Sequence, residues 1–181
     1  NGAVISASGL NVKAKMADVD GDTTNTFSAK AVSGSSGATT GVAGSVAINI
    51  GMTDTSATIA DGATVTIKGG GNVALEAQNQ NSNDAEAKAS QSGSGSSSVG
   101  VGASFALNIG ETDTRASIGD SSLLQGAGGM GDVSLTATST NVMTTVAEGG
   151  SAGQTAVTPV IAITVASNDT KAILSSGPTL T

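Results

Sequence analysis

Hydrophobic and polar residues alternate with a period of two over most of this chain. Val46, Ile48 and Ile50 take every second position, and small or polar residues lie between them. This alternation is typical of β-strands with one face toward a core. The same pattern recurs at 65–67, 73–77, 105–109 and 161–165. Gly-Gly, Asp-Gly and Ser-Gly clusters separate the segments, as turns require. The pattern predicts an all-β chain whose large apolar residues face inward.

The opposite face of the central segment is small and nearly uncharged. Ser45, Ala47 and Asn49 would then face outward, which is unusual for a sheet face in contact with water. A second layer of the chain or another subunit would cover them. The Gly/Ser-rich arms 33–44 and 90–102 are candidates for that layer, and disordered loops are the alternative.

Two blocks of sequence repeat in the same order, about 60 residues apart. Residues 42–51 return at 101–110, and a looser copy runs through 161–165. A second block beginning Asn11-Val12 returns at Asn72-Val73 and at 132–137. Fixed-period similarity is the signature of repeat architectures. The chain is expected to be one repetitive domain with repeats 1–62, 63–121 and 122–181, and a fragment of a longer protein.

These features predict a repetitive parallel β-solenoid, with a β-sandwich as the alternative. A repeat of this length is expected to hold two or three coils. The core is expected to be thin and built from small residues, because Phe27 and Phe105 are the only aromatic residues and 26 residues are Gly. The segment 84–89, where Ala alternates with charged residues, is predicted to be a strand. Pro159 lacks a backbone donor and indicates a bulge or an edge.

The residue inventory excludes several kinds of chemistry. The chain has no His and no Cys, which excludes Ser-His-Asp catalysis, thiolate nucleophiles and the usual structural zinc sites. Its net charge of −7 argues against nucleic-acid binding and against docking on an anionic bilayer. The absence of cysteine is consistent with a secreted protein. No apolar run reaches the length of a membrane span.

The segments 63–77 and 101–109 resemble the strand–turn–strand units of repetitive bacterial surface proteins. These are the filamentous-haemagglutinin-like and autotransporter-like adhesins, and the resemblance covers most of the chain. It implies a right-handed parallel β-helix stalk, secretion and a role in adhesion at the cell surface. It transfers no catalytic residue. The third repeat, which contains Pro159, departs from the pattern.

Asp18, Asp20 and Asp22 form the most suggestive candidate metal site. Three carboxylates at alternate positions beside a Gly turn suit a hard cation such as Ca²⁺. The EF-hand pattern fails, because position twelve is Ala29. The repeat offset from Asn11 to Asn72 aligns the three acids with Asn79, Asn81 and Asn83. A polar turn that is acidic in one copy is therefore the alternative interpretation.

Asp54, Asp113 and Asp169 recur just after the central strand of each repeat. Stacked carboxylates would bind cations between coils, but Asp and Thr more simply hydrogen-bond their own backbone at turns. Arg115 and Lys171 follow their aspartates by two residues, which favours local ion pairs.

The sequence thus predicts a non-catalytic, extracellular structural or adhesive module. It would act as a rigid stalk or a self-assembling surface fibre, with self-association and a surface or glycan partner expected. The alternative is a calcium-stabilised glycan-binding domain, and a polysaccharide-active β-helix enzyme is more remote. Such enzymes use carboxylate pairs and stack sugars on aromatic rings, and this chain has no Trp or Tyr.

Overall fold

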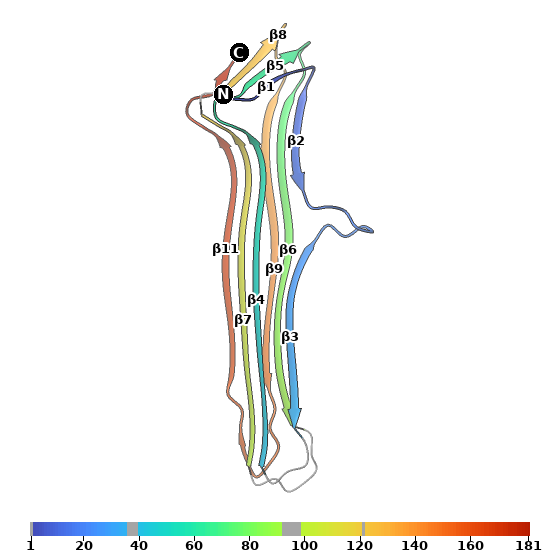
Figure 1. The fold of residues 1–181 in the computed structure, drawn as a ribbon, viewed down its shortest axis with the longest axis vertical. Coiled ribbons are helices and arrows are strands. Elements are labelled where there is room, and N and C mark those ends of the chain that lie inside the picture. Colours follow the sequence, from blue (N-terminus) through green and yellow to red (C-terminus); the bar gives the residue numbers. More distant parts are fainter. Residues whose placement is uncertain (1, 36–39, 92–98, 121) are drawn as a thin grey trace.

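The computed structural model describes residues 2–35, 40–91, 99–120 and 122–181, and the described part is all-β (Figure 1). The strands are β1 (Val4–Ala7), β2 (Leu10–Lys15), β3 (Asn25–Ser35), β4 (Thr40–Ile59), β5 (Thr64–Lys68), β6 (Val73–Gln91), β7 (Val99–Ile118), β8 (Leu123–Ala127), β9 (Val133–Gly149), β10 (Thr155–Val157), β11 (Val160–Leu174) and β12 (Thr179–Leu180).

The strands pair in parallel into three sheets, so the predicted all-β parallel solenoid is confirmed. The short sheet has the order β1-β5-β8-β12. In the β6 sheet, β6 pairs with β2 and β3 on one side and β9 on the other. In the β7 sheet, β7 pairs with β4 and with β10 and β11. Each coil passes once through the three sheets, and the next coil stacks on it in register.

One coil occupies one repeat, so the expectation of two or three coils per repeat is wrong. Val42 of β4 pairs with Val101 of β7, which lies 59 positions later. The coils are this long because the strands of the β6 and β7 sheets are: β4 and β7 have 20 residues each. At about 3.3 Å per residue, such a strand spans about 66 Å. The long sheets lie side by side, and the short sheet closes one end (Figure 1).

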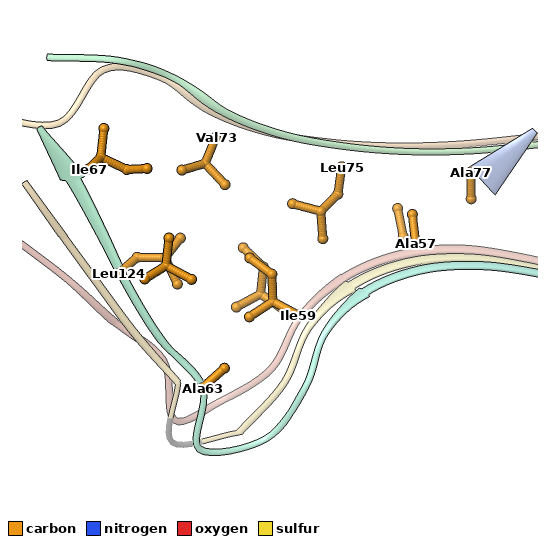
Figure 2. Packing of buried hydrophobic residues seen from close by; sticks show 11 residues of the cluster. Ala57, Ile59, Ala63, Ile67, Val73, Leu75, Ala77 and Leu124 are labelled. Carbon is orange, nitrogen blue, oxygen red and sulfur yellow. The ribbon is translucent and has the colours of Figure 1, made fainter. Parts of the chain in front are cut away.

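Where the three sheets meet, the interior is filled by aliphatic side chains (Figure 2). Ile67 of the short sheet, Leu75 of the β6 sheet and Ile118 of the β7 sheet are at most 1% exposed. The cluster, called here the aliphatic cluster, comprises Ala57, Ile59, Ala63, Val65, Ile67, Val73, Leu75, Ala77, Ala116, Ile118 and Leu124. Three walls diverge here and leave room for branched residues, so this end carries the conventional core.

Away from that end, only two sheets enclose the interior, and most of their inward side chains are small. Ala47 and Ala106 of the β7 sheet pack against Ala85 and Ala87 of the β6 sheet. This part of the interior matches the predicted small-residue core. The prediction that the large residues of β4 point inward is wrong. Ala47 is 3% exposed and its neighbour Ile48 is 52% exposed, so the small residues face inward and the large ones outward.

Buried polar side chains bridge the two long sheets. Asn108 of β7, fully buried, donates its amide hydrogens to the backbone carbonyls of Asn83 and Thr144, at 2.9 Å each. Its own amide oxygen accepts a bond from Asn49 of the neighbouring coil at 3.0 Å. The Ser104 hydroxyl likewise reaches a β9 carbonyl, that of Glu148, at 2.6 Å. Only short side chains allow this cross-sheet contact with backbone, which explains why large residues of β4 and β7 do not point inward here.

Larger inward residues on the β6 sheet lie opposite glycines on the β7 sheet. A Cβ added at Gly51 would come within 3.0 Å of the Phe27 ring and within 2.0 Å of the Asn83 amide oxygen. One added at Gly110 would lie 3.0 Å from the Met143 methyl group. These two inward glycines therefore leave the space that larger residues of the opposite sheet fill.

Pro159 interrupts the outer strand of the β7 sheet without changing its register. Val157 pairs with Val101 and Val160 with Ser104, so the offset to β7 is the same on both sides of the proline. The Pro159 carbonyl still accepts a bond from the Ser104 amide. Because β10 and β11 pair, among the described strands, only with β7, Pro159 lies at the edge of this sheet, so of the two predicted alternatives the edge is confirmed and the bulge is not. The strand prediction for 84–89 is confirmed within β6. The predicted Gly/Ser arms lie partly in strand ends, and their parts at 36–39 and 92–98 lie outside the described residues.

Ile67→Ala tests the aliphatic cluster. Ile67 is fully buried, so we expect a loss of about 2–5 kcal/mol in the free energy of unfolding. Ile48→Ala removes the same atoms from an exposed site, and we expect a loss below about 1 kcal/mol. Both values come from denaturant unfolding at low protein concentration. Equal losses would contradict the facing described above.

Asn108→Ala tests the polar bridge between the sheets. It leaves the carbonyls of Asn83 and Thr144 without their donor, so we expect a loss of about 2–5 kcal/mol in the free energy of unfolding. The control Asn11→Ala removes an exposed amide on β2 and should change stability by less than about 0.5 kcal/mol. An Asn108→Ala protein as stable as the control would show that these bonds do not hold the sheets together.

Candidate functional site

Asp18, Asp20 and Asp22 lie on an exposed turn that leaves the solenoid between β2 and β3 (Figure 1). An antiparallel bridge joins Val19 to Asp22 at the base of the turn. Asp20 has a φ of +54° and Gly21 of +87°, the left-handed geometry of a tight reversal. The Asp18 carboxylate accepts the Gly21 amide hydrogen at 2.8 Å. The Asp22 carboxylate accepts that of Thr24 at the same distance.

This turn is an insertion, so the predicted alignment with Asn79, Asn81 and Asn83 is wrong. The partner of Asn81 is Asn25, and the partner of Asn83 is Phe27. Nine residues separate β2 from β3, whereas two residues of β6 separate the stretches that pair with them. The seven additional residues are looped out of the stack. They include the acidic residues, which therefore have no counterpart in the second coil.

Asp18 and Asp22 stabilise the turn itself, because each carboxylate accepts a backbone amide hydrogen. Within the described ranges, no group of three or more acidic side chains is placed to hold a metal ion. Calcium binding at Asp18, Asp20 and Asp22 therefore stays a prediction from sequence.

Asp54, Asp113 and Asp169 lie side by side on the outer face of the β7 sheet, as their spacing predicts. Asp169 forms an ion pair with Lys171, which confirms the predicted local pair in the third coil. Arg115 forms none among the described residues, so the corresponding prediction for Asp113 is wrong. The stacked aspartates form an acidic row next to the apolar part of the same face.

The outer face of the β6 sheet carries ion pairs that run across the coils. Glu76 lies 2.7 Å from Lys15 and 3.3 Å from Lys13 of the first coil. Hydrogen bonds from Lys15 and then Lys13 hold the pKa of the Glu76 carboxyl below its ordinary value. The sequence contains these residues at same-face spacing, but the predicted alignment of Asn11 with Asn72 is two residues out of register, since Asn11 pairs with Ala74, and the ion pairs were therefore not predicted.

A second ion-pair chain lies nearer the other end of the same face. Lys30 and Lys88 each lie 2.6 Å from Glu86, and Lys88 lies 3.4 Å from Glu148. The pKa of Glu86 is lowered by Lys30 first and then by Lys88. The pKa of Lys88 is raised by Glu86 first and then by Glu148. Charges thus connect the three coils on this face.

The outer face of the β7 sheet is apolar over much of its length. Val46, Phe105 and Ile161 form one row across the three coils, and Ile48, Leu107 and Ile163 form the next. On the outermost strands these side chains remain exposed: Val46 by 62% and Ile161 by 52%. Further rows are Val42, Val101 and Val157, and Ile50, Ile109 and Val165. We call these four rows, together with the outward row of Gly44, Ala103 and Pro159 that lies between the rows of Val42 and Val46, the apolar face.

A hollow of about 320 Å³ crosses the apolar face. Its floor is the row of small or ring-closed residues Gly44, Ala103 and Pro159. One wall is the row of Val46, Phe105 and Ile161. The lining residues are Gly44, Ser45, Val46, Ala103, Ser104, Phe105, Pro159 and Ile161. The hollow could not be predicted from the alternation alone, which places the large residues inside.

Comparisons with protein-family models, curated proteins and solved structures find no match for this chain. The resemblance to repetitive adhesins therefore stays an interpretation of the sequence. Within the described residues, the search for a helix that would cross a membrane finds none.

The calcium prediction is tested by thermal unfolding with and without calcium chloride. Because Asp18 and Asp22 already bond the turn backbone, we expect the Tm of the protein and of an Asp20→Asn variant to be unchanged by calcium. A calcium-dependent rise in Tm that Asp20→Asn abolishes would establish the metal site.

Glu76 gives the protein an acid-sensitive contribution to stability. Because its pKa is lowered in the folded state, this contribution is present above the unfolded pKa of about 4.3 and is lost as the pH falls through the lower folded value. We expect Glu76→Gln to flatten the decline of Tm below about pH 4.5. Gln78→Ala, on the same face, should leave the decline unchanged. Identical acid profiles for Glu76→Gln and the parent would contradict the assignment.

Proposed function

We propose that this chain is a non-catalytic structural module of an extracellular surface, a stiff β-solenoid that presents two broad sheet faces for adhesion and assembly. The observation that carries the proposal is the contrast between these faces. One carries ion pairs that connect the coils, and the other is apolar and exposed.

The length of the coil favours a surface-presenting role over that of a thin spacer. Each coil advances a solenoid by one strand spacing, about 4.8 Å, yet it spans about 66 Å along the long strands. The stack therefore gains little length per residue and much width. A chain built this way is suited to presenting area.

The stacking itself supports stiffness. β4 and β7 pair without a break from Thr40 to Ile59, and side-chain hydrogen bonds follow the same register inside. Ser45 bonds Ser104, and Asn49 bonds Asn108, across neighbouring coils. Bending the stack would require these bonds to stretch together.

Small-angle scattering and a polysaccharide panel test the proposal together. We expect an elongated particle, longer than the roughly 66 Å of its long strands because the short sheet adds to one end, and no release of reducing ends from acidic or neutral polysaccharides. A compact, isotropic particle would contradict the extended solenoid. Release of reducing ends would favour the polysaccharide-active alternative.

A further inference from the structure

The small-residue row and the large-residue rows of the apolar face have complementary relief. Gly44, Ala103 and Pro159 form a trough that runs across the three strands. Two rows further on, Ile48, Leu107 and Ile163 form a ridge. The row of Val46, Phe105 and Ile161 lies midway between them.

A two-fold rotation about that middle row would place each ridge in a trough. With the axis in the plane of the face and parallel to the solenoid axis, strand direction reverses while each coil stays opposite its own copy. Ile48 then meets Gly44, Leu107 meets Ala103, and Ile163 meets Pro159 of the second copy. The same contacts form twice, as in an isologous interface.

We propose that the apolar face pairs with the same face of a second copy of this chain, with the two solenoids side by side and running in the same direction. The inference rests on the proposed structural function and names the surface and the partner through which assembly occurs. Two sheets packed face to face in this way are a standard arrangement of β-proteins, with a layer spacing of about 10 Å.

The face is large enough to form a specific interface. The paired region runs from Thr40 to Met52, symmetrically about Val46, and crosses three strands. At about 3.3 Å per residue and 4.8 Å per strand, its flat footprint is about 600 Å² per copy. A pair would bury about 1,200 Å², which exceeds the roughly 1,000 Å² expected of a biological interface.

The charge distribution favours a second copy over a lipid bilayer. The outer positions of the four apolar rows carry no charged residue, whereas the whole chain has a net charge of −7. In the two-fold arrangement the acidic row of Asp54, Asp113 and Asp169 lies beyond the paired region and stays in water. Glu111 falls at its rim, where interfaces are ordinarily polar.

Analytical ultracentrifugation over a concentration series tests the pairing. We expect the chain to form a reversible dimer. Leu107→Glu should raise the dissociation constant of this dimer at least tenfold, because it places a charge on the ridge. Ala103→Leu fills the trough while keeping the face apolar, and it should weaken the dimer by a similar factor. Non-specific hydrophobic association would instead be unchanged or strengthened by Ala103→Leu.

The matched control for Leu107→Glu is Gln78→Glu, which adds the same charge to the outer face of the β6 sheet. It should dimerise as the parent does. Circular dichroism checks that each variant folds, and the cross-linking experiment below does not depend on Leu107→Glu folding.

Single cysteines determine the symmetry, because the chain has none of its own. With a short bis-maleimide cross-linker, which spans the layer spacing of about 10 Å that a direct disulfide cannot bridge, we expect covalent dimers from Phe105→Cys and from Val46→Cys, which both lie on the axis. Ser82→Cys, on the β6 sheet, should give none. Linkage through Phe105→Cys without Val46→Cys would mean antiparallel solenoids and would overturn the proposed arrangement.

Monomers at every concentration would overturn the pairing, as would dimers that neither Leu107→Glu nor Ala103→Leu weakens. Monomers that bind phosphatidylcholine vesicles through this face would assign it to a membrane and also overturn the pairing. In each case an elongated particle in scattering would leave the proposed structural function intact. A compact particle would remove that function as well.

Discussion

The amide of Asn108 sets the separation of the two long sheets. It donates to two backbone carbonyls of the β6 sheet and accepts a bond from Asn49 of the next coil, so all of its hydrogen-bonding groups are used. A side chain this short reaches the opposite backbone only if the sheets lie close together. Close sheets in turn admit Ala, Gly and Ser between them and exclude larger aliphatic residues from the inward positions of β4 and β7.

The distribution of residues over the rest of the fold follows from that separation. Large aliphatic residues such as Ile67 and Leu75 are buried at the end where the short sheet forms a third wall. The remaining large residues of β4, β7 and β11 lie on the outer face. The same constraint therefore produces a thin interior and an exposed apolar surface, and it connects the stability of the solenoid to its capacity for assembly.

The sequence predicted the strands and their stacking because the 59-residue offset and the alternation are direct consequences of coil-on-coil register. It did not predict which face of β4 is buried. Hydrophobicity alone places Ile48 inside, and only the hydrogen bonds of Asn108 to the opposite sheet reverse that choice. The acidic turn was misaligned for a similar reason, since Asp18 and Asp20 lie in an insertion that the local pattern does not mark.

The facing of β4 is tested most directly by the native-state reactivity of single cysteines with a maleimide, at a concentration where the chain is monomeric. We expect Ile50→Cys to react rapidly and Asn49→Cys to react only when the protein unfolds, because Asn49 is 6% exposed and Ile50 is 57% exposed. Rapid reaction at position 49 with protection at position 50 would contradict this facing.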